Sequence, residues 1–153
     1  MPIPATAAGT ALDPLTVVVE RGRLVLFAHA TGQTDPVYTD VATARAVGHP
    51  DLPVPPTFLF GLKLDMPAPF DWMTDLGIDL RTVLHGTQRF TYHRLAFAGE
   101  TVTFEPRITD VFDKRGGALE FVVLRTSVTR DGTPIAELEE TIVVRHPELE
   151  AAR

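Results

Sequence analysis

The chain has 153 residues, 44% of them hydrophobic, with 20 acidic against 14 basic side chains and a net charge of −6. This length suits a single domain with its own core. The acidic balance disfavours nucleic acid and anionic membranes as partners, because both select a basic face. The absence of cysteine excludes disulfides, thiolate catalysis and cysteine-ligated metals. Every apolar run is shorter than the ~20 residues of a membrane span and no secretory signal is recognisable, so we expect a cytoplasmic protein.

The first half of the chain predicts one strand and three helices. The strand is expected at 15–19 and the helices at 20–31, 40–48 and 57–66. Asp40 is placed to cap the second helix and Thr57 the third. Because TFLFGLKLDM is apolar on nearly every side, we expect the third helix to be buried all round. The segment 67–83, which carries Trp72, is predicted to be an irregular insertion that forms a flap or a partner surface.

The second half predicts a sheet of four long antiparallel strands, at 87–97, 100–112, 118–130 and 134–145. In TVTFEPRITDVF, Val102, Phe104 and Ile108 alternate with polar neighbours, which is the period of a strand with one buried face. Asp131-Gly132 is a strong hairpin signal, because both central residues of a type I′ turn need positive φ. Strands this long twist and curl. We therefore expect a sheet wrapped around the buried helix, with an open edge that favours pairing with a second subunit.

Several segments, in this order, resemble a known family: VVVERGRLVLFAHATGQTDPVYTD, LPVPPTFLF, VLHGTQRFTYHRLAFAGETVTF and DKRGGALEFVVLRTSV. The chain resembles the MaoC-like (R)-specific enoyl-CoA hydratases and (3R)-hydroxyacyl dehydratases, and more narrowly their N-terminal-half subfamily, the FAS1-like dehydratase domain. The resemblance implies an α+β hot-dog fold, in which a long curled antiparallel sheet wraps a buried central helix. It also implies one MaoC-like domain over residues 1–153, with 67–83 as its flap.

The loop ATGQTDPVYTD at residues 30–40 departs from the catalytic pattern of that family, which reads Gly-Asp-x-Asn-Pro, an aliphatic residue and then His. Here Gly32 matches, but Gln33 stands in the place of the Asp and Tyr38 in the place of the His. Asp35 takes the Asn position. A side-chain amide cannot act as an acid or a base near neutral pH, and a phenol, with an ordinary pKa of about 10, is a poor base there. The loop therefore keeps the turn but lacks both proton-transfer groups.

His85, in LHGTQ, and Asp35 are the candidate surrogates for the missing groups. The resemblance implies that the His-Gly element lies beside the acyl tunnel, where His85 would donate a hydrogen bond near the thioester or act as a base. We prefer a structural histidine that bridges strand and flap, and a turn-forming role for Asp35 before proline. The five histidines show no ligand spacing, so neither a metal nor a cofactor is expected.

Substrate-binding residues are expected near the start of the buried helix and on the first long strand. The helix start offers amide hydrogens and a partial positive charge that would polarise a thioester carbonyl, although plain capping by Thr57 explains the same residues. The predicted substrate-binding residues are Pro56, Thr57, Phe58, Phe60, His85, Gly86 and Gln88.

The resemblance implies a subunit of an enoyl-thioester hydratase or (3R)-hydroxyacyl-thioester dehydratase. This chain would line the acyl tunnel, chiefly with Phe58, Phe60 and the 67–83 flap, while a second hot-dog subunit supplies the Asp and His. The ligand would be an acyl-CoA or acyl-carrier-protein thioester. Two alternatives stay open: a self-sufficient homodimeric hydratase that uses Asp35 with His85, and a non-enzymatic module that binds acyl thioesters.

Overall fold

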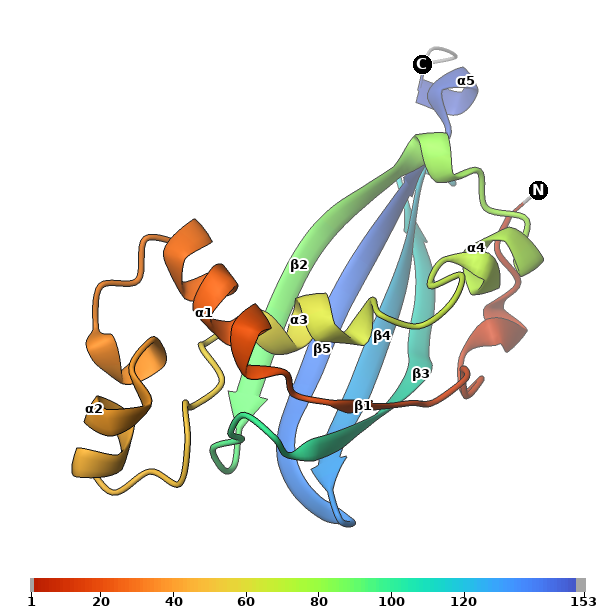
Figure 1. Cartoon of the computed structure of the whole chain (residues 1–153). Coiled ribbons are helices and arrows are strands. Elements are labelled where there is room, and N and C mark those ends of the chain that lie inside the picture. Colours follow the sequence, from red (N-terminus) through yellow and green to blue (C-terminus); the bar gives the residue numbers. More distant parts are fainter. Residues whose placement is uncertain (1, 151–153) are drawn as a thin grey trace.

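A computed structural model describes residues 2–150. Its centre is a five-stranded antiparallel sheet of strand order β1-β3-β4-β5-β2 (Figure 1). The strands are β1 (Leu15–Val18), β2 (Val83–Tyr92), β3 (Thr101–Lys114), β4 (Leu119–Arg130) and β5 (Thr133–Arg145). The predicted strands are all present, and the sheet confirms the expected α+β class.

The long strands form because their side chains alternate between a buried and an exposed face. Along β3, Val102, Phe104 and Ile108 are buried while their neighbours are more exposed. Asp131 and Gly132, between β4 and β5, have φ of 49° and 72°. These values confirm the expected hairpin turn with two positive φ angles.

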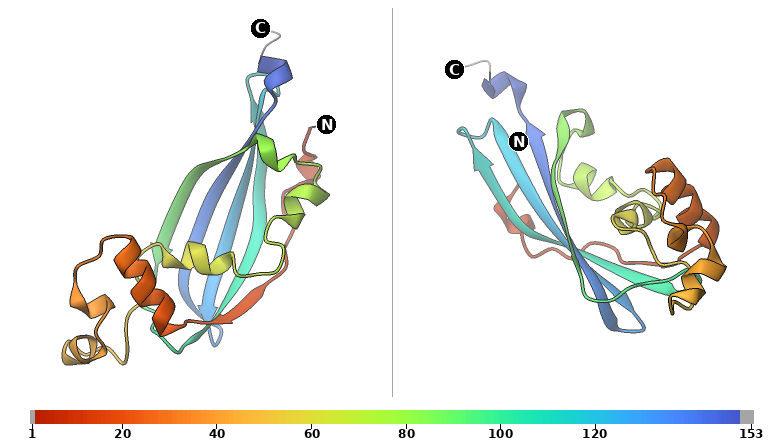
Figure 2. Two further views of the ribbon diagram at one scale, coloured as in Figure 1. Left: turned by 45° about the horizontal axis from the view of Figure 1, so that its top comes forward. Right: turned by 90° about the vertical axis from the view of Figure 1, so that its left-hand side faces the viewer.

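The first four helices lie over one face of the sheet, while the fifth follows β5 beyond the end of the sheet (Figure 1, Figure 2). The helices are α1 (Arg21–Ala30), α2 (Val41–Ala46), α3 (Phe58–Lys63), α4 (Asp71–Asp75) and the short α5 (Pro147–Glu150), with 3-10 turns η1 (Ala5–Ala7), η2 (Pro36–Tyr38) and η3 (Leu80–Thr82). Asp40 caps α2, since its carboxylate accepts a hydrogen bond from the Thr43 amide at 2.7 Å. Within the described residues, no helix is long and apolar enough to cross a membrane.

Two clusters of buried side chains form the core between the helices and the sheet. The first joins α1 and α3 to the strands through Leu24, Leu62, Phe104 and Leu138. The second joins η1 and α4 to the other half of the sheet through Met73, Ile108, Leu124 and Ile142. The α3 helix lies across the sheet between the regions that α1 and α4 cover (Figure 1).

Three expectations about these elements are wrong in detail. The segment 67–83 is not irregular, because it contains α4 and η3. The first long strand occupies 83–92 rather than 87–97, since the amides of His93 and Arg94 both donate to the Ile135 carbonyl and end the ladder. The α3 helix is not buried all round, because Gly61 is exposed.

Thr57 does not cap α3 with its side chain, which corrects a further expectation. Its backbone has φ of 70°, in the left-handed region, and its hydroxyl makes no capping hydrogen bond. The Thr57 amide instead donates to the Tyr92 hydroxyl at 3.0 Å, which ties the start of α3 to the end of β2. Burial raises the pKa of the Tyr92 phenol, and the bond from Thr57 partly offsets the effect.

Candidate functional site

The 30–40 loop uses its polar side chains to hold its own turn. The Gln33 side-chain oxygen accepts a hydrogen bond from the Asp35 amide at 3.0 Å. The Asp35 carboxylate in turn accepts one from the Val37 amide at 3.0 Å and so caps η2. None of residues 30–40 lines the main pocket of the described chain. The loop therefore has the structural role of a turn within this chain, on the side of the molecule where α1 and α2 lie (Figure 1).

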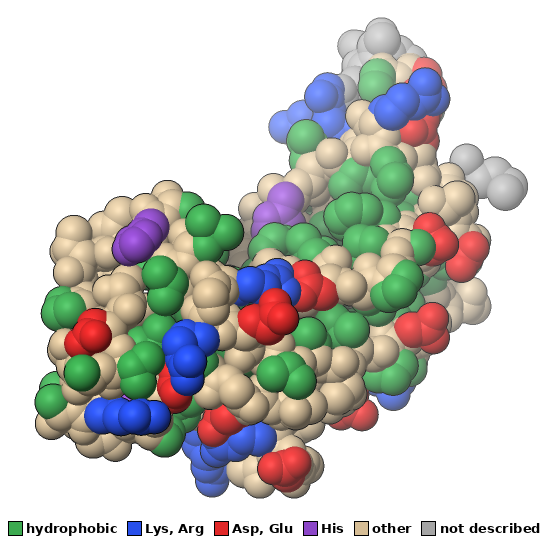
Figure 3. All heavy atoms as spheres, viewed as in Figure 1, with side chains coloured by type: hydrophobic (Ala, Val, Ile, Leu, Met, Phe, Trp, Pro, Cys, Tyr) green, Lys and Arg blue, Asp and Glu red, His purple; other side chains and the backbone are tan. Residues whose placement is uncertain are grey.

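The main pocket lies between α3, the 67–83 segment and the inner face of the sheet, with a volume of about 750 Å³. Figure 3 shows hydrophobic side chains gathered on this face, beside α4 and the long strands. The apolar lining includes Leu12, Phe60, Leu64, Phe70, Trp72, Met73, Leu80, Ile108, Leu124 and Ile142. A pocket of this size with a mostly apolar lining is typical of a small-molecule site.

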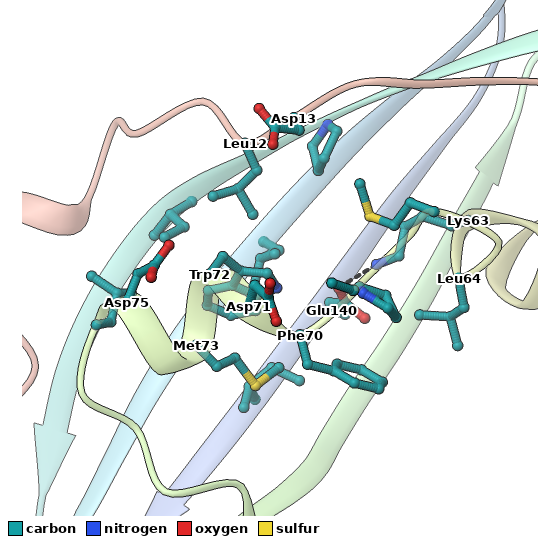
Figure 4. A pocket seen from close by; sticks show the side chains of 18 of the residues that line it. Leu12, Asp13, Lys63, Leu64, Phe70, Asp71, Trp72, Met73, Asp75 and Glu140 are labelled. Carbon is teal, nitrogen blue, oxygen red and sulfur yellow. Dashed lines mark hydrogen bonds and ion pairs between the residues drawn. The ribbon is translucent and has the colours of Figure 1, made fainter.

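One wall of the pocket carries a buried ion pair between Lys63 and Glu140 (Figure 4). Their side chains are only 10% and 8% exposed. His85 Nε2 lies 3.9 Å from the second carboxylate oxygen, Glu140 Oε2. The Phe60 ring stacks on the His85 ring with centroids 5.3 Å apart, and Lys63 Nζ lies 5.5 Å from the Phe60 centroid. The pocket thus combines an apolar volume with one cluster of charged and aromatic side chains.

Secondary structure explains why these side chains meet. Lys63 is the last residue of α3, where a cation suits the helix dipole. Glu140 points to the same face of β5 as the buried Leu138 and Ile142, because alternate side chains share a face. Sequence reasoning missed both residues. The available signal was a carboxylate at an inward position of the 136–144 alternation and a lysine in an apolar helix.

The structure places only Phe60 and His85 of the predicted substrate-binding residues on the pocket wall. Phe58 is buried in the core cluster that includes α1, while Pro56 and Thr57 are exposed outside the pocket. The amides of Thr57 and Phe58 already donate to the Tyr92 hydroxyl and the Pro55 carbonyl. The start of α3 therefore does not offer those two amides to a thioester.

Gly86 and Gln88 lie on β2 next to the pocket wall. The ladder between β2 and β5 shifts register between His85 and Thr87. A Cβ on Gly86 would come within 2.9 Å of Val143 Cγ2 and 3.0 Å of the Thr141 carbonyl oxygen, so any larger residue in this bulge would force its neighbours to shift. Gln88 faces Glu140 across the strands, and its side-chain oxygen is buried without a hydrogen-bond partner among residues 2–150.

The surrogate pair Asp35 and His85 does not form in this chain. Asp35 is exposed and caps η2, whereas His85 stacks on Phe60 and lies near Glu140. Within residues 2–150, no group of three or more histidine, aspartate or glutamate side chains is placed to hold a metal ion. The carboxylate that accompanies His85 is thus Glu140.

Comparison with protein families identifies the chain. A match to the FAS1-like dehydratase domain region covers residues 6–138. The chain belongs to this family. This FAS1-like dehydratase domain region is also similar to a UPF0336 protein of Leifsonia xyli subsp. xyli. The two are 36% identical over 132 residues, and the aligned region covers 86% of this chain and 87% of that protein.

Solved structures similar to this FAS1-like dehydratase domain include two complexes from Mycobacterium tuberculosis. A chain of the C-terminally truncated HadBC (3R-hydroxyacyl-ACP dehydratase) complex is 26% identical, with a TM-score of 0.76 over 90% of this chain and 96% of that chain. A chain of the ChsH1–ChsH2 complex is 21% identical, with a TM-score of 0.68 over 90% of this chain and 98% of that chain, which shows a shared fold. The predicted hot-dog fold and MaoC-like resemblance are confirmed.

Proposed function

We propose that this chain is the acyl-tail-binding subunit of an enoyl-thioester hydratase or (3R)-hydroxyacyl-thioester dehydratase. A second hot-dog subunit supplies the catalytic Asp and His. The observation that carries the proposal is the separation of two features. The 30–40 loop offers Gln33 and Tyr38 where the family's acid and base stand, while a pocket of about 750 Å³ with an apolar lining lies elsewhere in the chain. The chain keeps a ligand-binding volume and has lost the proton-transfer groups of the family.

The relatives support a two-subunit enzyme. HadBC is described as a complex and as a dehydratase of 3R-hydroxyacyl-ACP. The natural ligands of this chain are therefore proposed to be acyl-CoA or acyl-carrier-protein thioesters, bound with no cofactor. The whole chain acts as one domain, and the complex works in the cytoplasm.

An open sheet edge supports the proposed partner. β2 pairs with β5 on one side only, and it ends the strand order. Leu84 and Tyr92 on this strand are 52% and 47% exposed. An unpaired strand edge with exposed hydrophobic side chains is a template for pairing with another chain. A second hot-dog subunit would cover it.

The test is to purify the chain with its native partner and to assay hydration of enoyl-CoA substrates. The lone chain should show no hydration, and the complex should show turnover that is lost when the partner's Asp or His is replaced. Turnover by the lone chain would refute the division of roles. Binding of acyl thioesters without hydration by any copurified assembly would make the chain a binding module instead.

The contact between His85 and Glu140 favours a second candidate, a self-sufficient hydratase. The motif loop has neither a carboxylate at the position of Gln33 nor an imidazole at the position of Tyr38, and on the pocket wall these two groups lie 3.9 Å apart. The ion pair with Lys63 weighs against this candidate, because one of the two carboxylate oxygens of Glu140 is already held by the ammonium group. Hydration by the lone chain that is lost in Glu140→Gln and in His85→Ala, but kept in Asp35→Asn, would establish it.

A further inference from the structure

The Lys63–Glu140 pair is an unusual lining for a pocket that holds a plain hydrocarbon chain. Two nearly buried charges carry a desolvation cost that their attraction only partly offsets, and hydrophobic replacements of such pairs are often neutral or stabilising. A methylene chain packed against the pair would remove water from it and give no hydrogen bond in return. The occupant of the pocket therefore presents a polar group at this wall.

The pair offers both a donor and an acceptor to that group. An ammonium has three N–H donors, and Lys63 uses one of them toward Glu140 Oε1. Glu140 Oε2 faces His85 Nε2 at 3.9 Å, which exceeds the length of a hydrogen bond. A hydroxyl both donates and accepts, so one hydroxyl can accept from Lys63 and donate to Glu140. A carboxylate on the ligand would be attracted by Lys63 but repelled by Glu140.

The remaining charged residues of the pocket indicate which end of a thioester enters. Asp13, Asp71 and Asp75 also line it, and all three are exposed (Figure 4). These exposed carboxylates repel the phosphates of CoA or of a carrier-protein prosthetic group. The uncharged acyl tail is the end that this pocket accepts.

We propose that the pocket selects acyl thioesters with a hydroxyl on the tail, beyond the β-carbon, which accepts a hydrogen bond from Lys63 and donates one to Glu140. This inference rests on the proposed function, in which the partner's groups act on the carbons next to the thioester. It adds a substrate class, the tail-hydroxylated acyl chains, and two specificity-determining residues.

The experiment measures binding of matched medium-chain acyl-CoA ligands to the purified chain, or to its native complex, by isothermal titration calorimetry. The ligands are the plain saturated chain and the same chain with a hydroxyl at the β-carbon or at each carbon beyond it. At least one tail-hydroxylated ligand should bind about tenfold or more tightly than the plain chain, because a site built to pair a hydroxyl rejects the analogue without it.

Two double variants test whether the Lys63–Glu140 ion pair causes the preference for the hydroxyl. Lys63→Met with Glu140→Leu should fold, as a thermal melt would show, and should abolish the preference for the hydroxyl. The matched control is Arg125→Met with Glu139→Leu, which removes the 2.9 Å ion pair from the opposite face of the same sheet and should keep the preference.

Each remaining outcome is decisive. Equal or tighter binding of the plain chain by the unmodified protein overturns the inference and leaves the proposed function intact. A preference that survives in the Lys63/Glu140 double variant also overturns it. A preference for the β-hydroxyl alone would place the reacting carbons at this wall, which refutes both the inference and the division of roles. Failure of every acyl chain to bind, both as its CoA thioester and as its carrier-protein thioester, refutes the acyl pocket itself.

Discussion

At the scale of single residues, Gly86 shows how a small side chain shapes the site. It occupies the bulge of β2 between His85 and Thr87, packed against β5. The bulge re-aims the strand and leaves His85 on the pocket wall, stacked on Phe60. In the His-Gly element, glycine is thus needed for steric reasons, in addition to any chemical role of the histidine.

Gly86→Ala should destabilise the fold by about 1–3 kcal/mol, because the new methyl group would overlap the Val143 side chain and the Thr141 carbonyl. The free energy of unfolding in urea measures the effect. Gly22→Ala in α1 is the control, since nothing beyond its chain neighbours and the backbone of its own helix lies within 4 Å of the added Cβ. That variant should be stabilised by roughly 0.5–1 kcal/mol. Equal effects at the two positions would contradict the packing explanation.

A second residue-scale prediction concerns Asp51, whose pKa is lowered to about 2 chiefly by its hydrogen bonds with Arg21. A depressed carboxyl pKa stabilises the fold above the unfolded value of about 3.9, and this stability is lost as the pH falls toward the folded value. Asp51→Asn should therefore unfold at lower urea concentration than the unmodified protein at pH 7, and the gap should narrow between pH 4 and pH 2. Asp110→Asn, at an exposed position of β3, should differ little at either pH.

At the scale of elements, the Lys63–Glu140 pair fastens the end of α3 to the middle of β5. This contact joins the central helix to the strand that pairs with the edge strand β2. It also positions both side chains on the pocket wall. The stability of the fold and the proposed preference for a hydroxylated ligand therefore depend on the same two residues.

Lys63→Met alone should lower the free energy of unfolding by about 3–5 kcal/mol, because it leaves Glu140 charged and nearly buried without its cation. Combining it with Glu140→Leu should recover most of that loss. Urea unfolding of the two single variants and the double variant gives the coupling energy. Additive losses would show that the two charges are independent.

At the scale of the whole molecule, the open edge at β2 predicts association. The strand carries exposed Leu84, 52% exposed, and it has no neighbour beyond β5 within the described chain. Leu84→Lys should weaken association with a copy or a partner, because a charge on an edge strand opposes pairing. Sedimentation velocity measures the change, and thermal unfolding should show a correctly folded chain.

Val47→Lys is the matched control, since Val47 is 63% exposed at the end of α2, away from the sheet edge. It should leave the sedimentation behaviour unchanged. A chain that stays monomeric with and without its native partner would contradict the role proposed for β2.

The sequence determined most of the sheet and the nature of the motif loop. Alternating side chains place β3, β4 and β5, and positive φ at Asp131-Gly132 fixes a hairpin, because both signals are local. The loss of the family's acid and base at Gln33 and Tyr38 is equally a matter of residue identity. These features depend only on residues that are close together in the sequence, and not on contacts between distant segments.

The tertiary structure alone decided what faces the pocket. Lys63 and Glu140 are 77 residues apart and meet only because α3 crosses the sheet at β5. The same crossing brings Phe60 to His85, while Thr57 bonds Tyr92 instead of capping its helix. These contacts depend on the relative placement of helix and sheet, which is set by packing over the whole core, and no periodicity within a single segment encodes it.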